Sequence, residues 1–376
     1  NLFLSHLLKP SDYGTVSVVF QLLVFFAPFA LVGTELSILR YIPKYLEEEK
    51  FDYAAGFIRW AFQTFCRTSL AILLLGSILL TMSFILDDFH VKSIEKYSLI
   101  FDSFWIVPLF AFVTLQTSFL QALKRYFLSA SFGGFTLTIA IVLVTMALIA
   151  FFDNTWIGNY QKRFSLILCI GIACVIVIVA QSFMIRRHLP KELFQAIPRY
   201  QRKAWLKTSY QMMSSTIVFA SLSAIDIMML SFLGKDQAQV GHFAAIFVIA
   251  SSIVVFSAAV DMIVNPLISP SIEQGNKSHL QSILNILSVF KVIPTVILGV
   301  VILIFGADLL EHFGKGFSRA YGPLLVMLLG FVVGQLLNSS GPLLLYSGHQ
   351  ALSFKISIIQ LTSIILLDCI FIPLFQ

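Results

Sequence analysis

The sequence has few charged residues: Asp, Glu, Lys and Arg make up only 12% of it, about half of their usual share in soluble domains. The net charge of +6 does not indicate nucleic-acid binding, because the basic residues lie mostly in short connections between apolar runs. Cysteine is also scarce, and the spacing fits neither a zinc site nor a redox pair. We expect the four cysteines to be small buried hydrophobes: Cys66, Cys169, Cys174 and Cys369.

Motifs that mark an enzyme are missing from the sequence. It has no P-loop, no nucleophile elbow, no His-Glu-x-x-His zinc motif and no aspartate-rich motif that could hold a metal and a diphosphate. The connections on the less basic side are short, which leaves little room for a catalytic domain. We therefore expect neither enzymatic activity nor a cofactor.

Apolar residues make up 58% of the chain and are gathered in runs long enough to cross a bilayer. A hydrocarbon core about 30 Å thick needs about 20 helical residues. The runs are continuous rather than alternating, which indicates helices, not a barrel. The sequence thus predicts an all-α polytopic membrane protein. Ten runs roughly meet this length: residues 16–39, 69–86, 98–123, 135–152, 166–184, 215–233, 243–264, 292–305, 324–346 and 356–375.

Alternate connections between these runs differ in positive charge. One set carries 15 Lys and Arg residues and the other carries eight. Because cytoplasmic connections are enriched in Lys and Arg, we assign the first set to the cytoplasm. The basic members of this set include Arg40, Lys44, Lys50, Arg59, Lys124, Arg125 and the seven basic residues of 186–207.

The basic stretch 186–207 also divides the chain. It contains Pro190 and Pro198 and is long for a connection in this sequence. We expect an N-terminal helical bundle at 1–185, a cytoplasmic linker at 186–207 and an incomplete C-terminal bundle at 208–376. An anchor at anionic lipid headgroups is a second reading of the same stretch, and both can hold. The chain opens with Asn1 and stops directly after an apolar run, so we expect a fragment without the first and last helices.

Polar residues recur at helical spacing near the cytoplasmic ends of three spans. Arg59, Gln63 and Arg67 are four residues apart, which places them on one helical face. Lys124 ends the next span, and Arg40 lies on the last turns of the span before. A cationic vestibule open to the cytoplasm would explain the pattern. Snorkelling of interface residues toward the headgroups is the alternative.

Acidic residues inside apolar runs are expensive and therefore informative. Glu35 lies on the last turns of run 16–39, and Asp226 is surrounded by apolar residues. Asp226 is tolerable if it faces a cavity, pairs with a cation or takes up a proton. Lys291, at the start of a later span, is a possible cationic counterpart.

Several motifs resemble those of bacterial polysaccharide flippases, which belong to the multidrug/oligosaccharidyl-lipid/polysaccharide (MOP) exporter superfamily. The likeness covers nearly the whole chain and depends on the order and spacing of the motifs. They are LLKPSDYG at 7–14, GTE at 33–35, LRY at 39–41, DIMML at 226–230, GHFAA at 241–245, FG at 305–306, FSRA at 317–320 and LLLYSG at 343–348.

The resemblance implies two pseudo-symmetric helical bundles around a central cavity, with 12 or 14 helices in the complete protein. It implies a location in the bacterial inner membrane and alternating-access transport of undecaprenyl-diphosphate-linked oligosaccharide to the periplasmic leaflet. The protein would work among membrane lipids and beside polysaccharide glycosyltransferases and a polymerase. By this likeness Arg40, Arg67 and Lys291 would bind phosphate, and Asp226 or Glu35 would couple transport to H+ or Na+. Arg59, Gln63 and Lys124 complete the candidate substrate site.

Three alternatives remain at the level of sequence. A multidrug antiporter of the same fold would favour a cavity rich in carboxylates for organic cations, whereas the polar faces of the first half carry mostly Arg and Lys, which suits an anionic substrate. A membrane glycosyltransferase or polymerase would need a large external loop with catalytic groups, and the sequence has none. A scaffold that transports nothing is the third.

Overall fold

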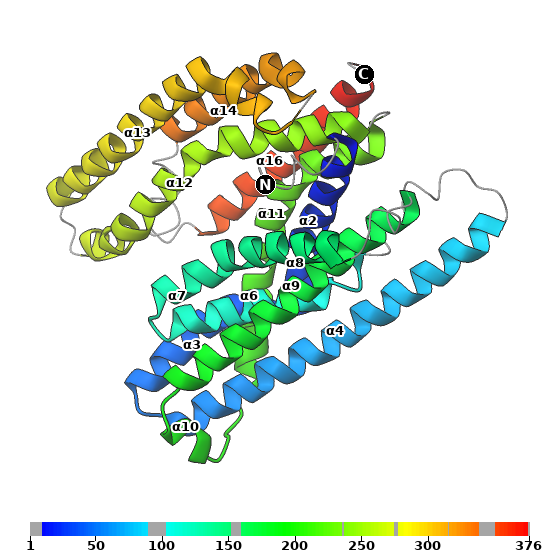
Figure 1. Ribbon diagram of the computed structural model, residues 1–376. Helices are drawn as coiled ribbons and strands as arrows, with labels where there is room; N and C mark the ends of the chain where they lie inside the picture. The colour runs from blue at the N-terminus through cyan, green and yellow to red at the C-terminus, as the bar shows by residue number, and fades with distance from the viewer. Residues whose placement is uncertain are drawn as a thin grey trace. The chain divides into compact units, whose positions relative to one another are not determined.

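The computed structural model describes residues 10–88, 103–151, 159–234, 237–273, 277–314, 316–337 and 350–374. Almost all of this part is helical, and it contains no strand (Figure 1). Each of the ten predicted apolar runs overlaps a helix. The all-α architecture predicted from the continuous apolar runs is confirmed.

The chain separates into two compact units, one formed by Val18–Met228 and the other by Asn1–Ser17 with Met229–Gln376. Both boundaries fall inside helices, namely α2 (Pro10–Leu31) and α11 (Arg202–Leu233). Contacts therefore assign most of α11 to the first unit. The predicted division into residues 1–185, 186–207 and 208–376 follows the connectivity of the chain and stays a prediction.

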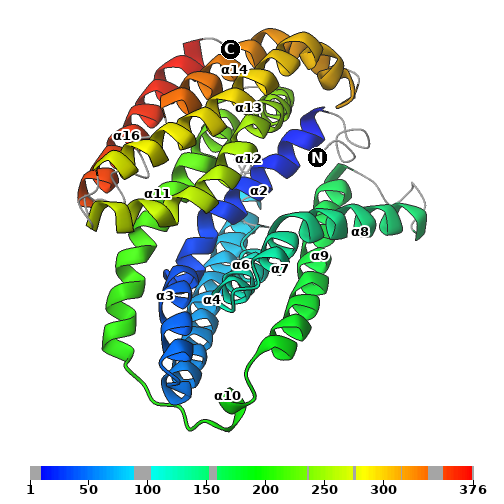
Figure 2. The same ribbon diagram turned by 90° about the vertical axis from the view of Figure 1, so that its left-hand side faces the viewer.

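In the unit Val18–Met228, α6 packs against α3 and α9, α8 packs against α9, and α4 packs against α3 and α6. The short helix α10 lies beside the start of α4 (Figure 2). Besides most of α2 and α11, the described elements of this unit are α3 (Thr34–Glu47), α4 (Phe51–Asp88), α6 (Val107–Ala122), α7 (Tyr126–Ala130), the π-helix η1 (Ser131–Thr136), α8 (Leu137–Phe151), α9 (Asn159–His188) and α10 (Glu192–Gln195).

In the other unit, α12, α13 and α14 pack side by side. The start of α2 joins them at Gly241, where a Cβ atom would collide with the carbonyl oxygen of Pro10. The ring of Tyr13 stands edge-on to Phe313 and Phe317, with centroids 6.1 and 5.9 Å away. The elements are α12 (Gln237–Glu273), α13 (Lys277–Glu311), the 3-10 helix η3 (Phe317–Ala320), α14 (Tyr321–Leu337) and α16 (Gln350–Leu374).

Nine helical stretches of the described part are long and apolar enough to cross a membrane. α6 is apolar as well but shorter. The protein is therefore a multi-pass helical membrane protein. The nine stretches are Tyr13–Leu31, Phe51–Met82, Tyr126–Ala147, Ile167–His188, Arg202–Leu233, Ala238–Ser257, Gln281–Glu311, Phe317–Leu336 and Phe354–Leu374.

The apolar run predicted at residues 16–39 is not one helix, which corrects the sequence interpretation. α2 ends at Leu31 and α3 begins at Thr34, and between them Val32 and Gly33 have φ angles of 53° and 73°. Glu35, which we expected on the last turns of a span, lies instead in the first turn of a new helix. A single glycine inside an apolar run does not reveal such a break, because glycine is tolerated in helices.

The expectation that all four cysteines are buried is only half right. Cys169 and Cys174 are buried, whereas Cys66 and Cys369 are exposed. The exposed pair lies on the candidate spans Phe51–Met82 and Phe354–Leu374. For Cys369, an outward side chain of a span meets hydrocarbon rather than water, so a small apolar thiol there needs no cover from the protein.

Candidate functional site on helices α3, α4 and α11

The break between α2 and α3 brings two backbones into direct contact. A Cβ atom at Gly33 would collide with the carbonyl oxygen of Ser209 on α11 and would lie 2.7 Å from the backbone nitrogen of Met213. The positive φ of Gly33 is also a conformation that glycine adopts at little cost. Glycine is thus required here twice, for the turn and for the approach of α11.

Further along α3 from this contact, polar side chains of α3 form a series of hydrogen bonds with side chains of α11. The hydroxyls of Ser37 and Ser209 lie 2.7 Å apart, and those of Tyr41 and Thr208 lie 2.9 Å apart. At the far end of α3, the indole N–H of Trp205 donates to the hydroxyl of Tyr45 at 2.9 Å. Hydrogen bonds between membrane helices contribute about 0.6 kcal/mol each on average, so the series fixes the pairing more than any one bond does.

Glu35 lies at the end of this interface that is next to Gly33, and it is 5% exposed. Neither carboxyl oxygen has a hydrogen-bond partner among the described residues. The nearby Thr216 hydroxyl donates to the carbonyl oxygen of Met212 instead. Burial raises the pKa of Glu35 to about 7. The polar groups of its own backbone and of Thr216 lower the pKa, but their effect is smaller than that of burial. The carboxyl group can therefore gain and lose a proton near neutral pH.

The stripe predicted from spacing lies on α4, which is one continuous helix. Arg59, Gln63 and Arg67 are all exposed, so they share an open face. The same face continues with Leu70 and Leu74, which are 59% and 57% exposed. Among the side chains of α4 that the structure describes, the charged part of this face thus lies in the half of the helix nearer to its start.

The cations predicted on the neighbouring helices differ in their surroundings. Arg40 is exposed on α3, with its guanidinium carbon 5.9 Å from the ring centroid of Tyr41. Lys124 lies in the turn between α6 and α7, and its Nζ is 2.9 Å from a carboxylate oxygen of Glu47. The carboxylate of Glu47 raises the pKa of Lys124 and neutralises the positive charge of its ammonium group. Arg40 is the more available cation of the two.

Three connections assigned to one side of the membrane meet at one end of this unit. The ion pair between Lys124 and Glu47 joins the α6–α7 turn to the end of α3. The guanidinium of Arg199 in the linker lies 3.1 Å from the carboxylate of Asp52 at the start of α4. The structure therefore brings together the basic connections that the alternation of spans places on the same side.

Asp226 and Lys291 lie in different units. Asp226 is half-buried on α11, in the unit Val18–Met228. Lys291 is 2% exposed on α13, in the other unit. The suggested pairing of the two, like the roles given to all the site residues, stays a prediction.

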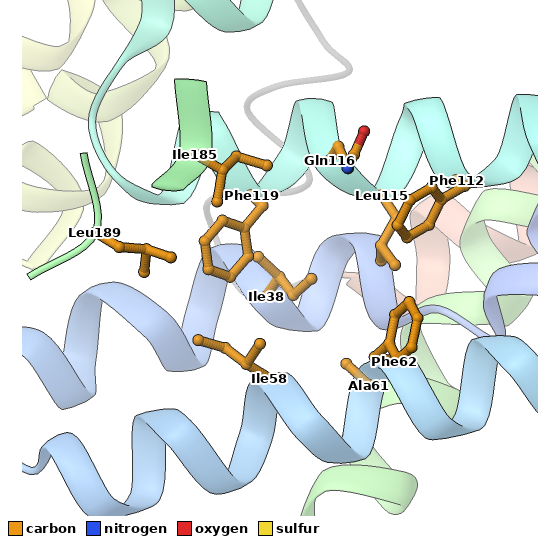
Figure 3. Close-up of a pocket in the computed structure, with 10 residues that line it drawn as sticks. All are labelled: Ile38, Ile58, Ala61, Phe62, Phe112, Leu115, Gln116, Phe119, Ile185 and Leu189. Carbon is orange, nitrogen blue, oxygen red and sulfur yellow. The ribbon is translucent and has the colours of Figure 1, made fainter. Parts of the chain in front are cut away.

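A small cavity of about 160 Å³ lies between α3, α4, α6 and α9 (Figure 3). Its walls are apolar except for Gln116, whose amide oxygen is directed away from Ile38 and Ile58 in the close-up. None of the sequence-predicted site residues lines it. The chemistry of this cavity suits hydrocarbon rather than a diphosphate or a sugar.

Sequence reasoning missed a buried polar network between α6 and α9. Gln116 donates to the hydroxyl of Ser182 at 2.6 Å, and Gln181 donates to the hydroxyl of Thr117 at 2.8 Å. The two glutamines are 7% and 0% exposed. Glutamines within apolar helices that are one turn or less from a Ser or Thr are the only sequence signal that could have indicated it. In the described part of the chain, no group of three or more His, Cys, Asp or Glu side chains could hold a metal ion.

Comparison with known proteins gives one informative result. No family model matches the chain, and no curated protein matches it. Among solved structures, the chain is similar to the inward-facing conformation of a multidrug resistance MATE family transporter of the MOP superfamily. The TM-score is 0.65 at 15% sequence identity, over 96% of this chain and 82% of that one. The chain thus has the fold of the MOP-superfamily transporters, which confirms the fold expected from its motifs.

Proposed function

We propose that this protein transports undecaprenyl-diphosphate-linked oligosaccharide across the bacterial inner membrane by alternating access, as a step in the assembly of cell-surface polysaccharide. The observation that carries the proposal is the open face of α4, on which Arg59, Gln63 and Arg67 are exposed side by side. The fold supports transport as the type of activity, and the charge of this face supports an anionic substrate.

The proposed substrate requires cations for its diphosphate. Arginine binds phosphate oxygens through two parallel N–H donors and keeps its charge in a partly dry cavity. We assign this role to Arg59 and Arg67 on α4 and to Arg40 on α3, with Gln63 as a neutral donor between the two arginines. Lys124 is a weaker candidate, because Glu47 already neutralises it. Lys291 on α13 stays a candidate from the sequence alone.

Coupling to an ion is assigned to Glu35 and Asp226. Glu35 is the stronger candidate of the two, because its carboxyl group is buried without a hydrogen-bond partner among the described residues and titrates near neutral pH. A proton or a sodium ion would satisfy it. The transporter would receive its substrate from polysaccharide glycosyltransferases and deliver it to a polymerase.

The test is transport of an undecaprenyl-diphosphate-linked oligosaccharide by the full chain in proteoliposomes. We expect Arg67→Gln to reduce the initial rate by about tenfold or more, since a lost bidentate phosphate contact costs about 1.5–3 kcal/mol. Arg67→Lys should recover part of the rate. Lys50→Gln is the matched control, because this exposed lysine is already paired with Glu48 at 2.7 Å. Equal rates for Arg67→Gln and the control would overturn the assignment.

A multidrug antiporter is the second candidate. It is favoured by the solved structure with the same fold, which is named as a multidrug resistance transporter, and by the buried carboxyl of Glu35. Proton-driven efflux of an organic cation such as ethidium would distinguish the two functions. Efflux that is lost in Glu35→Gln, combined with no oligosaccharide transport, would replace the first proposal with this one.

A further inference from the structure

The linker between α9 and α11 is fixed to the helices beside it. The backbone N–H of Arg199 donates to the carbonyl oxygen of Asp52 at 3.0 Å. A Cβ atom at Gly56 on α4 would collide with the carbonyl oxygen of Arg199. Leu193 of α10 is buried as well. The segment therefore presents a defined surface rather than a floating loop.

The first turns of α11 are fixed by one face only. Trp205 and Ser209 are fully buried, and Trp205 packs against Phe57 and Trp60 of α4 with ring centroids 5.2 and 5.6 Å away. Residues three or four positions apart share a face of a helix, so Trp205 and Ser209 share one face, and residues about half a turn away from them, such as Lys203 and Lys207, lie on the opposite face. The opposite face takes no part in these contacts with α3 and α4.

The opposite face of α11 carries two lysines and two large apolar side chains. Lys203, Leu206, Lys207 and Tyr210 follow the spacing i, i+3, i+4, i+7, and all four are exposed. Leu206 is 49% and Tyr210 is 67% exposed. We call these four residues the α11 platform. Neither lysine is in an ion pair with any other residue of the described chain.

The surroundings of the α11 platform are basic and apolar. Arg202 is exposed, with its guanidinium carbon 4.9 Å from the ring centroid of Tyr200. Ile197 in the linker is 83% exposed. Residues 186–207 contain seven basic residues and one acidic residue, Glu192. Only Arg199 among the seven has an ion-pair partner in the described chain.

This combination points to one kind of partner. Lysines interleaved with apolar side chains are typical of helical segments at the headgroup boundary of a bilayer, and these residues form the first turns of the candidate span Arg202–Leu233. A soluble anion such as free phosphate would not require Leu206, Tyr210 and Ile197 to be exposed. We propose that the α11 platform binds the headgroups of anionic phospholipids, with Lys203 and Lys207 on the phosphates and Leu206 and Tyr210 in the upper acyl region. The proposal does not depend on which substrate the protein transports.

The experiment compares lipid retention by the full chain purified from nanodiscs of phosphatidylcholine mixed with phosphatidylglycerol, read by native mass spectrometry. Each lysine near an anionic surface contributes about fivefold in binding, and the pair about 25-fold. We expect the variant with Lys203→Gln and Lys207→Gln to retain about 25-fold less phosphatidylglycerol than the unmodified chain. Its retention of phosphatidylcholine should not change. The matched control is Lys44→Gln with Lys50→Gln, the same change in charge on two lysines that already lie near Glu48.

Three results would overturn the proposal. The first is equal retention of phosphatidylglycerol by the platform variant and the control. The second is equal retention of the two lipids by the unmodified chain. The third is full displacement of phosphatidylglycerol by inorganic phosphate, which would assign the lysines to a soluble anion. Both lysines are exposed, so the substitutions leave folding intact, and unchanged thermal unfolding in detergent verifies this.

Discussion

The hydroxyl of Ser37 on α3 lies 2.7 Å from the hydroxyl of Ser209 on α11, across 172 residues of sequence. Ser37 is one turn after Gly33, where the two backbones touch, and both serines are fully buried. The pairing of α3 with α11 therefore holds α3 in position beside the end of α2. It also determines where Glu35 sits.

The first prediction concerns the close approach at Gly33. Replacing Gly33 by Ala adds a Cβ that collides with the Ser209 carbonyl and forces a left-handed conformation on a residue that disfavours it. We expect a loss of at least about 2 kcal/mol in the free energy of unfolding. Unfolding in mixed micelles with increasing SDS, followed by tryptophan fluorescence, measures it.

Gly171→Ala on α9 is the control for this change, because no atom lies within 4 Å of a Cβ at that position. In a helix with free space, Ala is more stable than Gly by about 0.4–1 kcal/mol. A Gly33→Ala variant as stable as Gly171→Ala would show that α3 does not rest on α11.

The second prediction concerns the bond between Trp205 and Tyr45. Trp205→Phe removes the donor and some buried volume, and should cost about 1–3 kcal/mol. Tyr45→Phe removes the acceptor, together with the longer bond of 3.5 Å that the Tyr45 hydroxyl donates to Gln201. The double-mutant cycle should give a coupling energy of about 1 kcal/mol, since the indole N–H is fully buried and its measured distance to the hydroxyl is 2.9 Å. A coupling energy below about 0.3 kcal/mol would mean that the bond does not stabilise this end of the interface.

The third prediction is a pH dependence that arises from Glu35. Its pKa rises from 4.5 to about 7 on folding, so the folded state holds a proton that the unfolded state has released. The free energy of unfolding should therefore fall as the pH rises through this interval, by about 1.4 kcal/mol per unit and about 3 kcal/mol in all. The full stability is present below pH 4.5 and the loss is complete above pH 7.

Glu35→Gln should remove this slope, because the amide does not titrate. SDS unfolding of both proteins at pH 5 and pH 8 measures the difference. Glu48→Gln serves as the control, since that carboxylate is exposed at the α3–α4 turn and its substitution should leave the slope intact. If the slope persists in Glu35→Gln, another group is responsible for it.

The sequence predicts the helical membrane fold and the shared face of Arg59, Gln63 and Arg67 because both follow from local patterns. Hydrophobic run length decides whether a segment spans the bilayer, and a spacing of four decides which residues share a face of a helix. Neither pattern depends on which helices are neighbours.

The pairing of α3 with α11 could not be predicted in the same way. Ser37, Tyr41, Ser209 and Thr208 are ordinary residues in apolar helices, and their partners are more than 150 residues away. From the sequence alone, Gly33 is a glycine that a helix would tolerate. The need for glycine there follows only from its contact with the backbone of α11. Trp205 is similar: an aromatic residue next to a basic stretch suggests the membrane interface, yet it is fully buried.

The last prediction tests whether the polar face of α4 meets water. Arg67 and Leu74 lie seven residues apart, which is almost two full turns, so they share that face. If the face lines an aqueous vestibule at its polar end, Arg67→Cys should react with a membrane-impermeant maleimide, whereas Leu74→Cys, deeper on the same span, should not. Native Cys66, which is exposed beside Arg67, must first be replaced by Ser together with the other three cysteines. Reaction at Arg40→Cys would extend the vestibule to α3. If neither arginine position is labelled in membranes while both react after solubilisation in SDS, the arginines lie against lipid, and the anionic substrate loses its binding surface.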